Sequence, residues 1–278
     1  IPSDPRYSQQ WHYPNINLPA AWDISIGSPN VVVAVIDSGA KFSHPDLGPR
    51  LNGGQYDFIR DPQRSRDGDG IDPIADDPGN DPSPGGSSFH GTHVAGTIGA
   101  VTNNGVGVAG VNWVSPLMTL RVLGLDGGAN YDIAQAILYA AGLPNDSGQV
   151  PSQKANVINM SLGGSSRSRS MGDAVAAAQA ENVVVVAAAG NDNTTDLHFP
   201  AAYDGVISVG ATDLSGGKTF YSNFGPRIDI VAPGGNTRVD ANGDGFADGV
   251  LSTLWDGDRD EPIYALYQGT SMASPHVA

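Results

Sequence analysis

The chain has 278 residues and carries 14 Lys and Arg against 29 Asp and Glu, so its formal net charge at pH 7 is −15. A charge of this sign argues against a nucleic acid or an anionic membrane as a partner, because both would repel it. The absence of cysteine excludes disulfides, zinc–thiolate sites and a cysteine nucleophile. No apolar run approaches the ~20 residues of a membrane span, and the length favours one large domain, 1–278.

Aspartate supplies almost all of the negative charge, since only Glu181 and Glu261 are glutamates and the other 27 acids are aspartates. Aspartate favours turns and helix caps, and its carboxylate is a hard oxygen ligand. The acids gather in two stretches, and we expect acidic insertions there, at about 57–88 and 234–264. Each is too long for an ordinary connection, so it is expected to be mobile or organised by something other than a core.

Short β-branched runs alternate with Ala-rich stretches along the chain. The runs predict strands at Val31–Ile36, Thr119–Leu123, Val157–Ser161, Val183–Ala188, Val206–Val209 and Arg227–Val231. The Ala-rich stretches predict helices at His90–Val101, Tyr131–Ala141 and Met171–Glu181. Because continuous apolar strands separated by helices are typical of a covered parallel sheet, we predict an α/β fold of three layers, with a mainly parallel sheet between helices.

Asp37 ends the first predicted strand, in the run VVVAVIDSG at 31–39. A carboxylate at this point lies at the carboxyl edge of the sheet, where α/β proteins keep their sites. The alternative is an ordinary turn or cap aspartate.

Two histidines, His90 and His93, open an Ala- and Gly-rich predicted helix in FHGTHVAGT. They suit metal ligands, a catalytic base with a packed neighbour, or capping residues. Zinc is disfavoured because no third nitrogen, sulfur or nearby glutamate follows at a typical spacing.

Ser271 lies between a Gly-Thr turn and a predicted helix start in GTSMASPHVA at 269–278. A hydroxyl there meets free N–H groups and the positive end of the helix dipole, which favour developing negative charge. An N-cap serine is the alternative. Taken together, a carboxylate, an imidazole and a hydroxyl are the groups required for acyl transfer through an activated serine.

The blocks VIDSG at 35–39, HGTHVAGT at 90–97 and GTSMASPHVA at 269–278 resemble the three active-site blocks of the subtilisin-like serine proteases, in the same order. The start of the chain is similar to the thermitase branch of that family. The resemblance implies that Asp37 orients the base, His90 is the general base and Ser271 is the nucleophile. It also implies that Asn191, after the run VVVAAAG, donates to the oxyanion, and that His93 is a structural neighbour.

The resemblance further implies that substrate backbone is held as an added strand between two edges of the site. Small side chains at the matching positions imply an open pocket and broad specificity. The substrate-binding residues expected on this basis are Gly127, Gly128, Ser161, Leu162, Gly163, Ala188, Ala189 and Gly190. One departure is Gln268, where family members commonly carry Asn, and we expect altered loop hydrogen bonding there without loss of activity.

Three calcium sites are predicted. The loop 240–248 matches the first nine positions of an EF-hand-type loop, although Leu251 occupies position 12 where a glutamate belongs; a solvated turn is the alternative. Its expected ligands are Asp240, Asn242, Asp244, Phe246 through its carbonyl, and Asp248. A less regular site is expected at Asp67, Asp69 and Asp72, with Asp61 or Asp77. The family resemblance implies a third, with side chains of Asp4, Asp46 and Asn104 and carbonyls of Thr102, Val106 and Val108.

These observations favour a secreted, calcium-stabilised serine endopeptidase of broad specificity, a monomer that acts on proteins or peptides and is made as a zymogen. A propeptide is a further expected partner. A C-terminal fragment is another, because the chain ends at Ala278, seven residues after Ser271, and the domain is expected to continue. Two alternatives remain: a non-catalytic calcium-binding module on the same fold, and a narrow proprotein-processing protease. Labelling by a serine-directed inhibitor distinguishes the first, and a peptide-library digest distinguishes the second.

Overall fold

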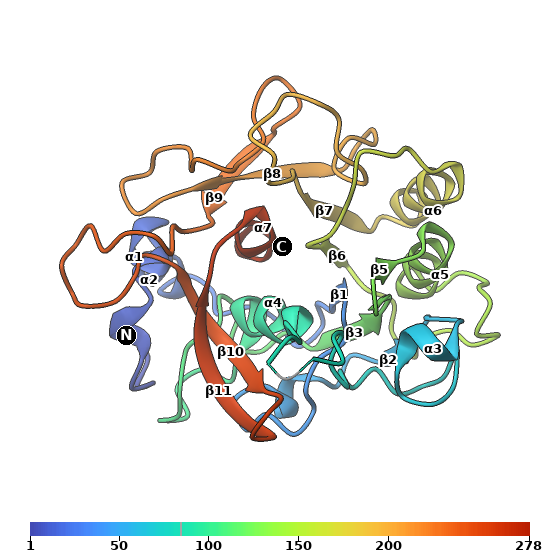
Figure 1. Ribbon diagram of the computed structural model, residues 1–278, viewed down its shortest axis with the longest axis horizontal. Helices are drawn as coiled ribbons and strands as arrows, with labels where there is room; N and C mark the ends of the chain where they lie inside the picture. Colours follow the sequence, from blue (N-terminus) through green and yellow to red (C-terminus); the bar gives the residue numbers. More distant parts are fainter. Residues whose placement is uncertain (84) are drawn as a thin grey trace.

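The computed structural model describes residues 1–83 and 85–278, and its centre is a seven-stranded sheet (Figure 1). The strand order is β2-β3-β1-β6-β7-β8-β9, and every neighbouring pair is parallel. The strands are β1 Val33–Asp37, β2 Gln55–Asp57, β3 Leu117–Arg121, β6 Val157–Met160, β7 Val184–Ala188, β8 Ile207–Thr212 and β9 Ile230–Pro233. All six predicted strands are present, and the short edge strand β2 was not predicted.

Helices cover both faces of this sheet, so the predicted three-layer α/β fold is confirmed (Figure 1). The four main helices are α4 His90–Gly99, α5 Asn130–Ala140, α6 Arg169–Ala180 and α7 Thr270–Val277. Strand β1 is buried along its whole length. Its Ala34 and Ile36 pack in the cluster that contains α5 and α6, whereas Val33 and Val35 pack with α4 and α7. A strand buried on both faces reads as a continuous apolar run, as observed.

Shorter elements complete the chain. They are η1 Tyr7–Gln9, α1 His12–Asn15, α2 Leu18–Trp22, η2 Gly48–Arg50, α3 Pro62–Ser65 and the small hairpin β4 Leu123–Gly124 with β5 Gly127–Gly128. Among the described residues, no helix combines the length and the apolar character needed to cross a membrane.

The expectation that the acidic stretch 234–264 is mobile or organised by something other than a core does not hold for its second half. Strands β10 (Val250–Asp256) and β11 (Glu261–Tyr267) form an antiparallel hairpin, and β10 is almost wholly buried. The hairpin packs on α4, where a Cβ at Gly96 would lie 2.0 Å from Thr253 Oγ1, so only glycine permits this approach. The acidic turn 256–261 makes the composition of the segment polar, and for this reason the sequence did not predict the apolar strands on either side of the turn. Among its described residues, 57–83 and 85–88, the first stretch contains little regular structure beyond the end of β2 and α3.

Candidate active site

Asp37 is the last residue of β1 and is fully buried, with 0% of its surface exposed. Its Oδ1 accepts a hydrogen bond from Ser38 N at 2.8 Å. His90 Nδ1 lies 2.8 Å from Asp37 Oδ1 and 3.0 Å from Oδ2, so both carboxylate oxygens face the same ring nitrogen. Because a carboxylate only accepts hydrogen bonds, Nδ1 carries a proton, and in the neutral ring Nε2 keeps its lone pair.

His90 begins helix α4, which places its imidazole beside the carboxyl end of β1. The next residue, Gly91, allows this contact, since a Cβ there would lie 2.0 Å from Gly39 O and 3.1 Å from Asp37 Cβ. The imidazole remains 23% exposed, so a substrate can reach it. Glycine therefore follows His90 because a side chain at position 91 would collide with the segment at the end of β1.

Opposing effects act on the basicity of His90. Burial lowers its pKa, but the charge of Asp37, the hydrogen bond to that carboxylate and the more distant charge of Asp77 raise it. The net result is a pKa of His90 above its ordinary value of 6.5. His93, by contrast, is fully buried, and burial lowers its pKa to about 3, so it is neutral near pH 7 and serves packing.

Ser271 lies in the first turn of α7, which packs against α4 (Figure 1). Its Oγ donates to Ser161 O at 3.1 Å, and Ser161 Oγ donates to Ser271 O at 2.7 Å. The second bond has a local cause: Pro275, four residues on, has no N–H to donate to the Ser271 carbonyl. In the described part of the chain no hydrogen bond joins the Ser271 hydroxyl to His90, so the structure brings Asp37 and His90 together but directs Ser271 Oγ to Ser161.

Asn191 follows β7 and is oriented through its oxygen. Asn191 Oδ1 accepts from Thr270 N at 2.8 Å and from Thr270 Oγ1 at 3.0 Å. Both acceptor positions of the amide are thereby used, which leaves Nδ2 as a donor to other groups. Asn191 and Ser271 line the same cavity of about 440 Å³.

Five of the eight predicted substrate-binding residues line two cavities that share part of their lining. The Ser271 cavity is lined by Leu162, Gly163, Gly164, Ser165, Ala188, Gly190, Asn191, Asp192, His198, Thr270 and Ser271. A second, of about 330 Å³, shares Leu162 and Gly163 and is also lined by Gly128. Ser161 precedes these shared residues, while Gly127 is exposed in the adjoining hairpin. Ala189 is buried and lines neither cavity.

Sequence reasoning missed His198 and Asp192, which also line the Ser271 cavity. A Cβ at Gly163 would lie 2.5 Å from His198 Nε2, and one at Gly190 would lie 2.9 Å from His198 Nδ1, so this imidazole packs on the two glycines. Burial lowers the pKa of His198, with the charge of Asp192 opposing. The pocket is thus not walled by small residues alone. The irregular segment 192–198 carries no motif that could have revealed this.

Asp4 and Asp46 fit a cation best among the predicted calcium ligands. They are 4% and 0% exposed, and no Lys, Arg or His of the described residues forms an ion pair with either. Burial, together with the smaller effect of the Asp4 charge, raises the pKa of Asp46 to about 6 against several hydrogen bonds that lower it. Asn104 Nδ2 donates to Asp46 Oδ1 at 2.8 Å, and Val108 N donates to Oδ2 at 2.9 Å. A buried, unpaired pair of carboxylates is stabilised by a divalent ion.

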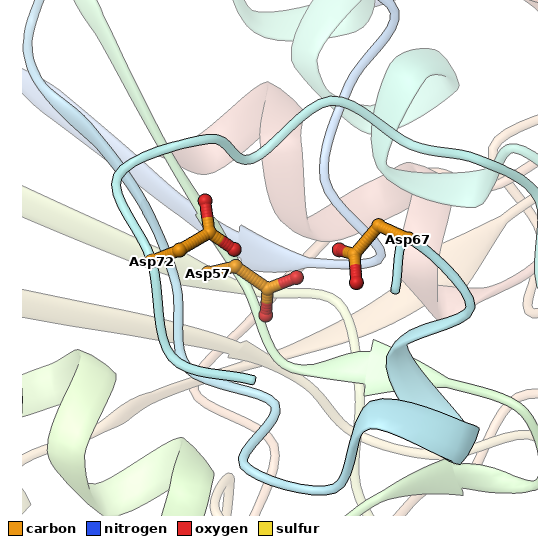
Figure 2. Close-up of side chains that lie close together, drawn as sticks. All are labelled: Asp57, Asp67 and Asp72. Atoms are coloured by element: carbon orange, nitrogen blue, oxygen red, sulfur yellow. The ribbon is translucent and has the colours of Figure 1, made fainter. Parts of the chain in front are cut away.

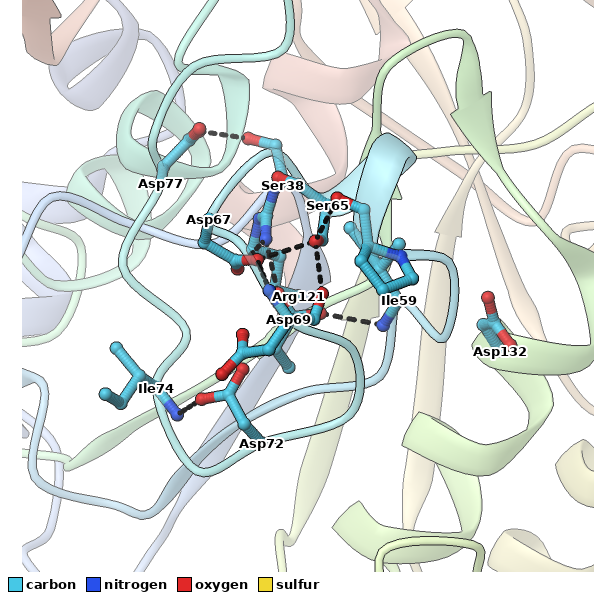
Figure 3. Close-up of polar contacts among 12 residues, drawn as sticks. Ser38, Ile59, Ser65, Asp67, Asp69, Asp72, Ile74, Asp77, Arg121 and Asp132 are labelled. Carbon is cyan, nitrogen blue, oxygen red and sulfur yellow. Dashed lines mark hydrogen bonds and ion pairs between the residues drawn. The ribbon is translucent and has the colours of Figure 1, made fainter.

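The first acidic stretch gathers a different set from the predicted one. Carboxylate oxygens of Asp57, Asp67 and Asp72 lie within 4.8 Å of one another (Figure 2). The buried guanidinium of Arg121 pairs with Asp57. It also pairs with Asp67 at 2.6 Å (Figure 3). The positively charged guanidinium of Arg121 therefore already lies between these carboxylates, so the cluster suits a calcium ion less well. Asp61 instead caps α3 through Gln63 N, and the Asp69 carbonyl accepts from Ser65 Oγ.

The loop 240–248 folds around its own backbone. The Asp240 carboxylate accepts from the N–H groups of Gly243, Asp244 and Gly245. Within residues 1–83 and 85–278, Asp57, Asp67 and Asp72 are the one carboxylate set that gathers within 4.8 Å, so Asp240, Asp244 and Asp248 are not brought together. Leu251 lies in β10 and is buried, which removes position 12 as a ligand.

Residues 28–278 match the model of the subtilase family, and the chain belongs to that family. It is 44% identical to an extracellular protease of Xanthomonas campestris pv. campestris, over 100% of this chain and 48% of that protein. It is 35% identical to thermitase of Thermoactinomyces vulgaris, over 100% of this chain and 82% of thermitase. A solved structure, described as proteases from Pseudoalteromonas arctica PAMC 21717, matches with a TM-score of 0.92 and 44% identity, over 100% of this chain and 84% of that one.

The chain spans about half the length of some of these relatives, 48% of the Xanthomonas protein and 47% of an extracellular basic protease of Dichelobacter nodosus. The predicted family membership is confirmed.

Proposed function

We propose that the chain is a serine endopeptidase that hydrolyses peptide bonds through an acyl-enzyme. The observation that carries this proposal is the Asp37 carboxylate facing His90 Nδ1 at 2.8 and 3.0 Å, beside the helix that bears Ser271. A serine-directed phosphonofluoridate tests it: the protein should be labelled at Ser271 and lose hydrolysis of casein in parallel. Unlabelled Ser271 in folded protein, under conditions that label an active protease, contradicts the proposal and favours a non-catalytic binding module.

The reaction begins when the Ser271 hydroxyl turns from Ser161 O toward His90 Nε2. His90 takes the hydroxyl proton as Ser271 Oγ attacks the substrate carbonyl carbon, and Asp37 stabilises the resulting imidazolium. Asn191 Nδ2 and Ser271 N–H donate to the oxyanion of the tetrahedral intermediate. His90 then protonates the leaving amine, the C–N bond breaks, and a water molecule activated by His90 hydrolyses the ester in the same way.

The substrate lies as an added strand beside Ser161–Gly163 and Gly127–Gly128, and its side chain before the scissile bond enters the Ser271 cavity. The volume of about 440 Å³ accepts large side chains, which supports broad specificity. A digest of a randomised peptide library measures this directly. Cleavage confined to one residue type, such as after basic residues, contradicts broad specificity and supports a processing protease.

We further propose that the protein is secreted and bound to calcium through Asp4, Asp46 and Asn104, with carbonyls of Thr102, Val106 and Val108. Calcium there neutralises two buried carboxylates and fixes the N-terminal segment to the loop 102–108. Several relatives are named extracellular proteases, which supports secretion. Calcium at the two other acidic loops remains a prediction with less structural support.

Substitution of Asn191 by alanine should lower kcat by about 10²–10³-fold with little change in KM, the range found for this donor in another protease of the family. The reason is that Asn191 Nδ2 binds the oxyanion, which exists only after attack. Steady-state kinetics on a peptide amide substrate measures both constants. Asn30→Ala, at an exposed position, is the matched control. A rise in KM at unchanged kcat would assign Asn191 to ground-state binding instead.

The pH dependence of kcat/KM should show an acid limb whose midpoint lies above 6.5. His90 works as a base only when neutral, and its pKa is raised because Asp37 more than offsets the effect of burial. Activity is therefore lost as the pH falls through the raised pKa. Rates at substrate concentrations well below KM, from pH 5 to 9, measure the midpoint. A midpoint below 6.5 would show that burial dominates over the carboxylate.

A further inference from the structure

Asp77 is a second buried carboxylate close to the Asp37–His90 pair, and the proposed chemistry does not use it. It lies in the first acidic stretch and is 1% exposed. Its Oδ2 accepts from Ser38 Oγ at 2.7 Å, and its Oδ1 accepts from Gly79 N at 2.8 Å (Figure 3). Its own N–H donates to Ala40 O at 3.3 Å, which fixes its backbone beside the segment that follows β1.

Ser38 connects Asp77 to both members of the pair. Ser38 N donates to Asp37 Oδ1 at 2.8 Å, and Ser38 Oγ accepts from Gly91 N at 2.9 Å. The Gly91 N–H is one of the first donors of α4, which have no partner within the helix. Asp77 holds the hydroxyl proton of Ser38 on its own side, so the oxygen lone pairs of Ser38 face Gly91. One side chain thus ties the end of β1 to the start of α4.

Burial of the Asp77 carboxylate costs free energy of folding, and no ion pair with another described residue offsets that cost. Burial, together with the smaller effect of the Asp37 charge, raises the pKa of Asp77 to about 6 against the lowering effects of Ser38, Gly79 and the more distant Arg121. Arg121 forms its ion pairs with Asp57 and Asp67, and no ion pair to Asp77 occurs in the described part of the chain. A buried carboxylate without a cationic partner is unfavourable for folding, which points to a role in the site.

We propose that Asp77 is a positioning residue of this active site: through Ser38 Oγ it fixes the start of α4 against the end of β1 and so holds the His90 imidazole on Asp37. This inference rests on the proposed peptidase function. A carboxylate suits the task because Asp77 accepts from two donors at once, Ser38 O–H and Gly79 N–H. The two donors bond to different oxygens of Asp77, Oδ2 and Oδ1, and an amide has an accepting oxygen at only one of these two positions.

The test compares Asp77→Asn, Ser38→Ala and the double variant with the wild type and with Asp76→Asn. Asp76 is a matched control because it is the adjacent aspartate, bonded to Lys41 Nζ and Phe42 N and not to Ser38. Steady-state kinetics gives kcat and KM. Nuclear magnetic resonance of the His90 ring nitrogens gives its titration midpoint and does not depend on turnover.

Each single variant should lower kcat roughly tenfold to a hundredfold with KM nearly unchanged, the size of effect that a small misplacement of a catalytic group produces. The double variant should be no slower than the slower single one, because both act by one route. Loss of the Asp77 charge should also move the His90 midpoint to lower pH in Asp77→Asn. Asp76→Asn should leave kcat, KM and the midpoint unchanged.

Effects that multiply in the double variant, or a kcat within twofold of wild type in folded Asp77→Asn, would overturn the proposal. If Asp77→Asn fails to fold, Ser38→Ala carries the test, because it removes the same hydrogen bond and keeps the carboxylate. A wild-type protein without peptidase activity would contradict the proposed function, and a His90 midpoint that still shifts in Ser38→Ala, which keeps the Asp77 charge, would support the positioning role. Wild-type activity with no change in either variant would contradict the positioning role alone.

Discussion

Replacement of Ser271 by alanine is expected to lower kcat by at least about 10⁴-fold, because no other group at this position can form the acyl-enzyme. His90→Ala should have a similar effect, since the serine hydroxyl is a weak nucleophile without a base. The double variant should be hardly slower than either single variant, because the two residues act as a unit. Hydrolysis of a chromogenic peptide, with active-site titration of the wild type, measures these losses.

Ser152→Ala is the matched control, since Ser152 is exposed. Circular dichroism and thermal melting establish that each variant is folded, which matters because Ser271 Oγ bonds to Ser161 O. Folded Ser271→Ala with more than a tenth of the wild-type kcat would rule out the proposed nucleophile. A wild-type protein that is inactive from the start would leave the calcium-binding module as the better account.

Removal of calcium is expected to lower the melting temperature by about 5–10 °C. Calcium at a hundred times its dissociation constant stabilises the folded state by about 2.7 kcal/mol, and a domain of this size loses about 2–4 °C per kcal/mol. The physical cause is the pair Asp4 and Asp46, which are buried without a cationic side chain. Differential scanning calorimetry in calcium and in excess chelator gives the shift, at a pH above 7, which is higher than the pKa of about 6 of Asp46.

Asp46→Asn should be less sensitive to chelator than the wild type, since it removes one of the two buried charges that bind the ion. Asp173→Asn, which alters an exposed aspartate on α6, should keep the full wild-type shift. Equal melting temperatures of the wild type in calcium and in chelator would contradict the calcium proposal. A full shift retained in Asp46→Asn would move the stabilising ion to another acidic loop, such as the one at Asp240.

Residues that act through their own local sequence could be predicted without a structure. Asp37, His90 and Ser271 each lie at a strand end or helix start with small neighbours, and these short blocks contain both the residues of the proposed chemistry and the small residues that packing requires. Gly91 is an example, because its lack of a side chain lets α4 approach β1. Strands β1, β3, β6, β7 and β8 were likewise predictable, because a strand buried on both faces requires an unbroken apolar run.

Contacts between distant segments were not predictable from one sequence. The β10–β11 hairpin was missed because its acidic turn dominates the composition of the segment, and its burial depends on packing against α4. His198 enters the Ser271 cavity from a segment without a motif. The direction of the Ser271 hydroxyl, toward Ser161 O, depends on a residue that follows β6 and lies 110 residues away in the chain.

The sequence by itself determined the parallel α/β fold, the family and the residues at the ends of β1 and the starts of α4 and α7, because these follow from local patterns of polarity and size. It also determined that the charge of −15 resides in aspartates. Only the tertiary structure decided what each aspartate does. Asp37 faces His90, Asp77 accepts a hydrogen bond from Ser38, and Asp57 and Asp67 bind Arg121. Asp46 is buried and forms no ion pair with another described residue. These differences arise because burial and the choice of partner depend on segments that meet only in the folded chain.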